Sequence, residues 1–196
     1  MAKPGATSRE RILVGAADMI SRRGLNATSI RELAKHAKAP LGSTYHFFPE
    51  GKQQLATEAV RHAGEAVARI LRTELDAGPV AGLRAFLALW RGIVVDSDFR
   101  AGCPVLAVSV EEPPSDEIPP ALVAAAEAFE GWERLLTDAL TAHGADPDRA
   151  PGLAALVVAS VEGAIAMCRA KRSMEPLDQV AQQLETLITG ALERPA

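Results

Sequence analysis

Residues 28–48, with the sequence TSIRELAKHAKAPLGSTYHFF, constrain the fold of this chain more than any other segment. Ser29, followed three residues later by Glu32, forms a capping-box pattern that starts a helix. Pro40 suits the first turn of a second helix, and Pro49 ends that helix after two aromatic residues. The segment therefore predicts two short helices joined by a tight turn, the helix-turn-helix arrangement.

Charge is divided unevenly between the N-terminal part of the chain and the remainder. Residues 1–49 hold eight Lys and Arg against three Asp and Glu, a net charge of +5, so the other residues carry −9 and the whole chain −4. A basic module on an acidic remainder suits a protein that docks on phosphates through one part only. A solvated charged face would give the same asymmetry, so charge alone does not decide the function.

The same segment resembles the DNA-binding region of TetR-type transcriptional regulators. The shared features are a tyrosine, a Phe-Pro pair and a lysine that opens the next helix, here Tyr45, Phe48-Pro49 and Lys52. The inserted Gly51 and the sequence GCPV at 102–105 resemble the LmrA/YxaF-like branch of that family. The resemblance implies an all-α fold in which a three-helix DNA-binding head precedes a larger helical body that binds a small molecule and forms dimers.

The resemblance also implies which residues meet DNA. The second helix of the motif would face the major groove with Gly42, Ser43, Tyr45 and His46. Thr28, Ser29 and Lys52 would hold phosphates, partly through N–H groups at helix N-termini. Arg31 is the best candidate for a contact with a base edge, since arginine to guanine is the commonest specific contact.

Two positions depart from the family pattern. Leu41 stands where many relatives carry a lysine, and Lys38 stands where a glycine is common in the turn. Without the resemblance, the same segment could be a helical hairpin of some other all-α protein.

Only helical periodicity is visible in the rest of the chain, and no strand pattern or internal repeat is found. The head is expected over 6–66 and the body over 67–196. The spacing of apolar residues predicts helices over 8–23, 29–37, 40–48, 52–75, 80–95, 103–110, 118–142, 153–172 and 177–192.

The segment 153–160 is apolar nearly all round, so its helix should be covered on more than one side. A symmetric contact that uses this helix and the last one would join two copies of the chain, and twofold dimers are the commonest oligomers. The alternative is a central core helix within a monomer.

A ligand pocket in the body can be predicted only from residue type. Ligand sites are mostly apolar, and the bulky or soft candidates are Phe86, Trp90, Cys103, Phe129, Trp132 and Met167. For each of these residues taken alone, plain core is the favoured interpretation. Glu162 lies in an apolar helix, where a carboxylate is costly unless it is paired or hydrogen-bonded. It could pair across a dimer, contact a ligand or point to solvent.

Several functions are disfavoured by what the sequence contains. It has no Gly-rich phosphate loop and no His with Ser or Cys at a recognisable spacing, so we expect neither an enzyme nor a cofactor or metal. Cys103 and Cys168 are expected to be small buried hydrophobes, with redox sensing as the less favoured alternative. The acids at 111–112 and 116–117, in a proline-rich loop, are expected to be solvated.

The N-terminus shows no signal-peptide pattern, so the expected location is the cytoplasm. The longest apolar run, 153–168, is short for a bilayer span, so no membrane association is expected. The predicted function is a ligand-responsive DNA-binding regulator, most simply a repressor released from an inverted-repeat operator by a small apolar molecule. The alternative is an all-α dimeric interaction protein whose helix-turn-helix is structural.

Overall fold

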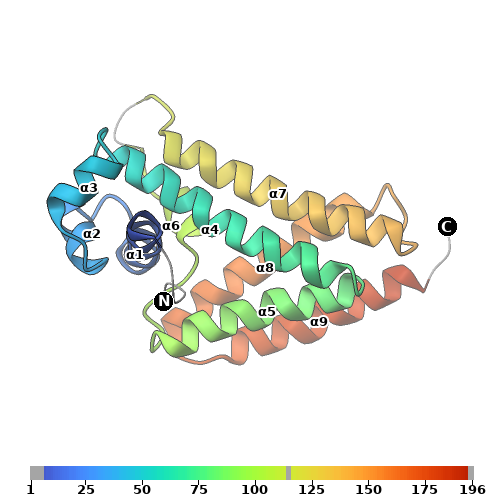
Figure 1. Cartoon of the computed structure of the whole chain (residues 1–196). Helices are drawn as coiled ribbons and strands as arrows, with labels where there is room; N and C mark the ends of the chain where they lie inside the picture. Colours follow the sequence, from blue (N-terminus) through green and yellow to red (C-terminus); the bar gives the residue numbers. More distant parts are fainter. Residues whose placement is uncertain (1–6, 114–115, 194–196) are drawn as a thin grey trace. The chain divides into compact units, whose positions relative to one another are not determined.

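The computed structural model describes residues 7–113 and 116–193, and every regular element in these two ranges is a helix. The prediction of an all-α fold is therefore confirmed (Figure 1). In chain order the helices are α1 (Ser8–Arg23), α2 (Ile30–His36), α3 (Leu41–Phe47), α4 (Lys52–Leu75), α5 (Pro79–Asp96), α6 (Pro104–Ser109), α7 (Pro120–Ala142), α8 (Ala150–Lys171) and α9 (Glu175–Leu192).

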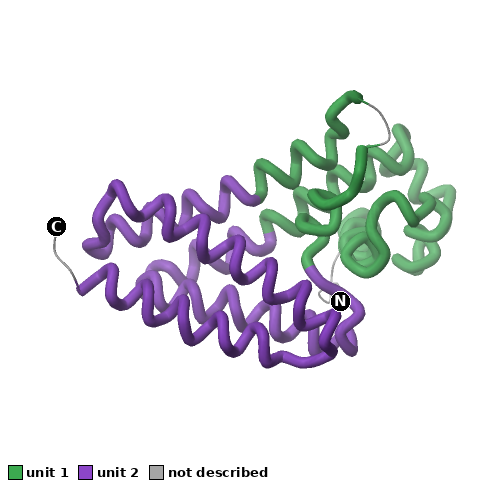
Figure 2. The backbone as a smooth tube through the Cα atoms, turned by 180° about the vertical axis from the view of Figure 1, so that it is seen from behind, with its two compact units in different colours: residues 1–65, 103–128 green, residues 66–102, 129–196 purple. Residues whose placement is uncertain are grey.

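The chain packs as two compact units, which Figure 2 shows in different colours. Unit 1 comprises residues 1–65 and 103–128, and unit 2 comprises residues 66–102 and 129–196. Helices α4 and α7 each contribute residues to both units. The predicted division into 6–66 and 67–196 concerns function and stays a prediction; by packing, residues 103–128 group with the N-terminal unit.

Helix α1 is the centre of unit 1, because it packs against α2, α3 and α6. Thr7 and Glu10 form a capping box at its start. A Cβ atom at Gly15 would lie 2.6 Å from the Cβ of Ala37, so glycine is needed for α1 to approach the end of α2 this closely. The buried stripe of α1 includes Ile12, Leu13, Ala16, Ala17 and Ile20.

In unit 2, helices α5, α8 and α9 pack against one another. Beside them lies a cluster of four aromatic rings, in which the centroids of neighbouring rings are 5.4 to 6.1 Å apart. Edge-to-face pairs at such distances add to the stabilisation that burial of the rings provides. The cluster consists of Phe86 and Trp90 from α5 and Phe129 and Trp132 from α7.

Two helices of unit 2 begin earlier than the sequence pattern predicted. Helix α8 starts at Ala150 rather than at 153, and α9 starts at Glu175 rather than at 177. Each has a proline within its first turn, at Pro151 and Pro176. Proline fits there because the first N–H groups of a helix have no partner inside the helix. Pro176 falls between the predicted helices 153–172 and 177–192, and in the structure it lies inside the second one.

By length and composition alone, α8 could cross a membrane. In this fold it packs against α5 and α9 and carries a buried carboxylate, Glu162, so we regard it as a core helix. Both Cys103 and Cys168 are free and buried. Burial raises the pKa of the Cys168 thiol, which makes this sulfur a poor nucleophile.

Candidate nucleic-acid interface

A left-handed residue closes the turn between α2 and α3. Lys38 has a φ of 53°, and its N–H donates to the carbonyl of Lys35. The next N–H, of Ala39, donates to the carbonyl of Ala34. These two bonds define a Schellman motif, in which the left-handed position usually holds glycine. Lysine therefore forms this turn in place of the usual glycine and adds an exposed cation to it.

Helix α3 has one anchored face and one outward face. Thr44 is fully buried and its hydroxyl donates to the Pro40 carbonyl, while the buried Phe48 ring lies 5.3 Å from the guanidinium carbon of Arg9. On the outward face Tyr45 is 48% exposed, although it is a large aromatic residue. Of the other predicted groove residues, Gly42 and His46 are exposed and Ser43 is half-buried. The predicted groove residues thus lie outside the anchored face of α3.

Two of the predicted phosphate ligands, Thr28 and Ser29, directly precede α2, and they differ in exposure. Ser29 is exposed and forms the predicted capping box with Glu32. Thr28 is only 5% exposed, and both its N–H and its hydroxyl donate to the Leu25 carbonyl. A phosphate needs a donor, and Thr28 has both of its donors engaged inside the molecule. The phosphate contact predicted for Thr28 stays a prediction for which the structure shows no available donor, whereas Ser29 and Arg31 are exposed.

Lys52 opens α4 and is half-buried. It lies close enough to α2 for its charge to act on Glu32. The pKa of Glu32 is lowered first by its hydrogen bonds with Ser29 and further by the charges of Arg23 and Lys52. The structure thus brings Ser29 and Lys52, two of the predicted phosphate ligands, to one side of the head. The first N–H groups of α4 point out of the helix there, since Leu55 donates the first bond, to Gly51.

A carboxylate clamp that sequence reasoning missed joins α1 to α2. Asp18 Oδ2 accepts from Arg22 Nε at 2.9 Å and lies 2.5 Å from His36 Nε2. Burial alone would raise the pKa of Asp18, but the hydrogen bonds from Arg22 and His36 outweigh burial and lower it. The pair of Asp18 and Arg22 has the i,i+4 spacing that a helix makes visible in sequence, whereas no local pattern connects Asp18 to His36.

Four cations are exposed on the helix-turn-helix and the turn before it, and two of them, Arg31 and Lys35, lie on α2. Side chains of this kind supply the sequence-independent part of DNA affinity. The others are Arg23, at the end of α1, and Lys38, in the turn.

The predicted ligand residues are distributed over both units. Phe86, Trp90, Phe129 and Trp132 form the aromatic cluster of unit 2, and the buried Glu162 belongs to the same unit. Cys103 is buried in unit 1. Met167 is 48% exposed on α8, so its side chain points away from the core. The structure therefore brings four of the seven candidates together.

The acids after α6 differ from one another, and one of them contradicts the sequence expectation. Glu112, Asp116 and Glu117 are exposed, as expected for solvated acids. Glu111 instead accepts hydrogen bonds from two backbone N–H groups of the turn between α1 and α2. A partner 85 and 86 residues away leaves no pattern in the sequence around Glu111.

Comparisons with known proteins agree with this geometry. Residues 12–59 match the family described as "Bacterial regulatory proteins, tetR family". Residues 79–183 match "Transcriptional regulator LmrA/YxaF-like, C-terminal domain". The HTH-type regulator Rv0196 of Mycobacterium tuberculosis is 42% identical over 94% of this chain and 95% of its own length. YxaF of Bacillus subtilis is 30% identical over 92% of this chain and 95% of its own length.

The fold is also that of solved structures. The TetR-family regulator CifR, solved as a cysteine mutant with a 26-base-pair operator duplex, gives a TM-score of 0.74 at 21% identity over 94% of this chain and 98% of its own. The chain is a DNA-binding transcriptional regulator and not an enzyme. It belongs to the TetR family, in the branch of LmrA and YxaF.

Proposed function

We propose that this regulator is a homodimeric repressor that leaves an inverted-repeat operator when a small, largely apolar molecule binds its body. The observation that carries the proposal is helix α4, which begins at Lys52 in unit 1 and runs without a break to Leu75 in unit 2. A rigid element that belongs to both units can transmit a change in one of them to the other. We place this activity in the cytoplasm.

DNA is read by the outward face of α3 and the exposed N-terminal part of α2. Tyr45 and His46, beside Gly42 and Ser43, face the major groove, and Arg31 reaches a base edge. Ser29, Lys52 and the free N–H groups at the start of α4 hold phosphates. The exposure of these side chains and the buried anchors beneath them support this assignment.

Two copies of the chain pair through α8 and α9. The exposed residues of α8 recur every three or four positions, which places them in one stripe along the helix. Apart from Pro151 and Lys171, near its two ends, they are small or apolar: Gly152, Leu156, Ala159, Gly163, Ala166, Met167 and Ala170. Leu156 of α8 and Leu187 of α9 are 45% and 48% exposed and line one groove of about 820 Å³. A second copy would cover this surface, and small residues let the two backbones approach closely.

The ligand binds at the aromatic cluster of unit 2. Trp90 is only 2% exposed, yet its indole N–H has no hydrogen-bond partner among the described residues. A buried donor without an acceptor costs free energy, which an oxygen or nitrogen acceptor on a ligand would recover. We therefore expect planar apolar compounds that carry one acceptor. Ligand and DNA then oppose each other by linkage, each weakening the other by the same factor, typically about 5- to 150-fold.

The DNA assignment is tested by operator titration. The operator is first selected from a random duplex library with the native protein. The variant with both Arg31→Ala and Tyr45→Ala should lose specific binding while its helicity and dimerisation stay native. Lys171→Ala, which removes an exposed cation from unit 2, is the control and should bind normally. Native affinity in the double variant would exclude this reading surface.

The dimer is tested by light scattering at micromolar concentration. Ala159→Arg places a bulky charge in the exposed stripe and should produce monomers, because it overpacks a close contact and leaves a charge buried. The control Ala142→Arg, at the end of α7, should stay dimeric. A native protein that is monomeric under these conditions would refute the proposed pairing, and with it the inverted-repeat operator.

The ligand is sought by a thermal-shift screen of small apolar compounds, followed by operator titration with every hit. Trp90→Phe keeps the aromatic ring and deletes the N–H, so it should weaken acceptor-bearing hits more than hits without an acceptor. If hits stabilise the protein and leave operator affinity unchanged, the body is a scaffold for dimerisation and not an inducer site.

A further inference from the structure

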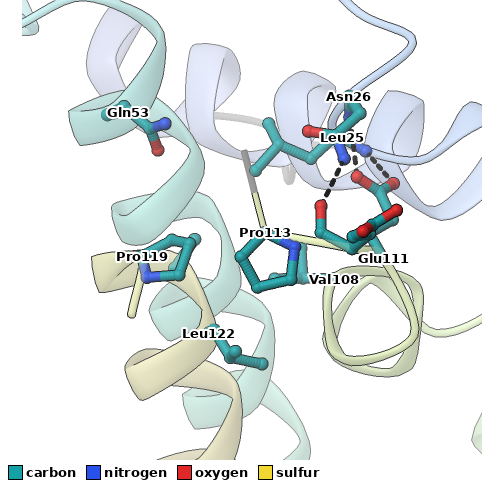
Figure 3. A pocket seen from close by; sticks show the side chains of 10 residues that line it. Leu25, Asn26, Gln53, Val108, Glu111, Pro113, Pro119 and Leu122 are labelled. Carbon is teal, nitrogen blue, oxygen red and sulfur yellow. Dashed lines mark hydrogen bonds between the residues drawn. The ribbon is translucent and has the colours of Figure 1, made fainter. Parts of the chain in front are cut away.

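The turn between α1 and α2 holds a carboxylate in a nest of backbone N–H groups. Glu111, two residues beyond the end of α6, accepts from the Leu25 N–H at 2.5 Å with Oε1 and from the Asn26 N–H at 2.7 Å with Oε2. The Asn26 side chain donates in turn to the Glu112 carbonyl at 3.1 Å. Figure 3 shows Glu111 and its two bonds to the turn. Successive N–H groups that converge on one anion are a recurrent anion-binding arrangement.

Gly24, the residue before Leu25, leaves room for this carboxylate. Its φ is +79°, a left-handed value that favours glycine. A Cβ atom at Gly24 would lie 2.0 Å from Oε1 of Glu111, so any larger residue would displace the carboxylate from the nest. Both the backbone conformation and the space above it therefore require glycine.

Bonds within the turn connect the nest to the DNA-reading part of α2. Leu25 is buried, and its carbonyl accepts from both the N–H and the hydroxyl of Thr28. Ser29 follows directly and caps α2, and Arg31 lies in the first turn of that helix. Because α2 has only seven residues, its own hydrogen bonds cannot fix its position. The place of its N-terminal end depends on the turn that Glu111 holds.

The surroundings of the nest favour a positioning role over a ligand site. The neighbouring cavity has a volume of about 30 Å³, and Val108, Pro113, Pro119 and Leu122 are among the residues that line it (Figure 3). This is far below the several hundred Å³ of a typical small-molecule site. Glu111 is half-buried at this cavity, and its two described hydrogen bonds lead to the turn.

We propose that Glu111 is a positioning residue for DNA reading: its carboxylate fixes the α1–α2 turn and thereby the phosphate- and base-contacting end of α2. The proposal rests on the proposed DNA contacts of Ser29 and Arg31. Glu111 also belongs to the stretch that matches the LmrA/YxaF-like C-terminal domain, while its partners belong to the tetR-family N-terminal stretch. The hydrogen bonds of this carboxylate thus connect, inside unit 1, the two stretches of the sequence that match the two family models.

The test compares Glu111→Ala with Glu112→Ala by operator titration at several salt concentrations. Both variants lose one acidic side chain from neighbouring positions, but Glu112 contributes only its backbone carbonyl to the turn. Loss of negative charge by itself strengthens DNA binding. We expect Glu111→Ala to weaken operator binding about tenfold, within the usual range for coupled sites, and Glu112→Ala to bind at least as well as the native protein. Only Glu111→Ala should therefore weaken operator binding.

The salt dependence separates positioning from simple stabilisation. A misplaced α2 loses phosphate contacts, so the slope of log K against log [salt] should become shallower by about one for Glu111→Ala. A residue that only stabilises the fold would lower the melting temperature and leave the slope and affinity of the folded protein unchanged. Equal affinities and slopes for the two variants would overturn the proposal.

A milder variant covers the case in which Glu111→Ala unfolds the head. Glu111→Gln keeps one acceptor oxygen and turns an amide toward the second N–H. It should fold, bind the operator with intermediate affinity and exchange its Leu25 and Asn26 amide hydrogens faster than the native protein. Native affinity in Glu111→Gln, with slow exchange at both amides, would equally refute the proposal. If Arg31→Ala with Tyr45→Ala abolishes binding while both Glu111 variants bind normally, this inference fails and the proposed function stands.

Discussion

The two units of this regulator are stabilised in different ways. In unit 1, helix α2 has only seven residues, and its place is fixed by side chains that bond to backbone or to another helix. These side chains are the capping residues of α1 and α2, the clamp of Asp18 and the carboxylate of Glu111. In unit 2 the helices are longer and pack through apolar faces, and several ion pairs, such as Arg84 with Glu185 and Arg91 with Asp178, lie at the surface.

This difference corresponds to what each unit has to do. Polar bonds have strict geometry, so they hold a reading surface in one position, and their loss displaces that surface. Apolar packing supplies most of the stability of a fold without fixing single atoms in this way, and the aromatic residues of unit 2 suit the apolar ligand that we propose. Mutations should therefore act mainly on stability in unit 2 and mainly on geometry in unit 1.

The largest expected effect is loss of a buried ring from unit 2. Trp132 is fully buried and contacts Phe86 and Phe129, so Trp132→Ala should lower the free energy of unfolding by about 3–5 kcal/mol. Val95→Ala, at a residue that is 50% exposed, is the control and should change it by less than about 0.5 kcal/mol. Chemical denaturation at one fixed protein concentration measures both, because dimers gain stability with concentration. Equal losses would mean that the aromatic cluster is not the core of unit 2.

A medium effect is expected from two glycines of unit 1 that both have a positive φ and differ in surroundings. Gly24 and Gly51 have φ of +79° and +77°, values at which alanine is strained by about 1–3 kcal/mol. Only at Gly24 does the new Cβ displace the Glu111 carboxylate, since nothing lies within 4 Å at Gly51. Gly24→Ala should therefore cost about 2–4 kcal/mol.

Combining Gly24→Ala with Glu111→Ala provides the check. In the absence of the carboxylate, the cost of Gly24→Ala should fall, measured by the same denaturation, whereas the cost of Gly51→Ala should not depend on residue 111. A cost that does not depend on residue 111 would show that backbone strain, and not displacement of the carboxylate, determines the effect.

The smallest effect is a difference in acid sensitivity. In unit 1 hydrogen bonds from Thr7 and Ser29 lower the pKa of Glu10 and Glu32, and the Arg22 and His36 bonds lower that of Asp18 against the opposing effect of burial. Each carboxylate stabilises the fold fully above its unfolded pKa, 4.5 for Glu and 3.8 for Asp, and the stabilisation is lost as pH falls through the lowered folded value. Unit 2 has a comparable case in Glu185, whose pKa is lowered by Arg84.

The corresponding measurement is the melting temperature between pH 6 and pH 3. Glu10→Gln, Asp18→Asn and Glu32→Gln together should flatten the fall below pH 4.5, with Asp18 contributing less than about 1 kcal/mol because it is partly solvated. Glu130→Gln, exposed on α7, should follow the native curve. If the melting temperature of the triple variant fell as steeply in acid as that of the native protein, other groups would be responsible for the loss of stability.

What the sequence predicted correctly depends on short separations along the chain. Both capping boxes, the turn around Lys38 and the outward face of α3 follow from neighbours within about four residues, where local rules are strong. Glu111 was misread as solvated because its partners, Leu25 and Asn26, are 86 and 85 residues away. The hydroxyl of Thr28 suits a phosphate and a neighbouring carbonyl equally well, and only the fold shows that it donates to the carbonyl of Leu25. The acids at 116 and 117 were read correctly as solvated.

The composition of unit 1 has a consequence for how the protein is made. Residues up to 65 leave the ribosome before 103–128, yet α6 packs against α1 and Glu111 bonds to the turn that follows it. At about 5–20 residues per second, the 63 residues from 66 to 128 take about 3–13 seconds to synthesise. During that interval the nascent head lacks both α6 and the carboxylate of Glu111. The DNA-reading surface is therefore complete only after more than half of the chain has been translated.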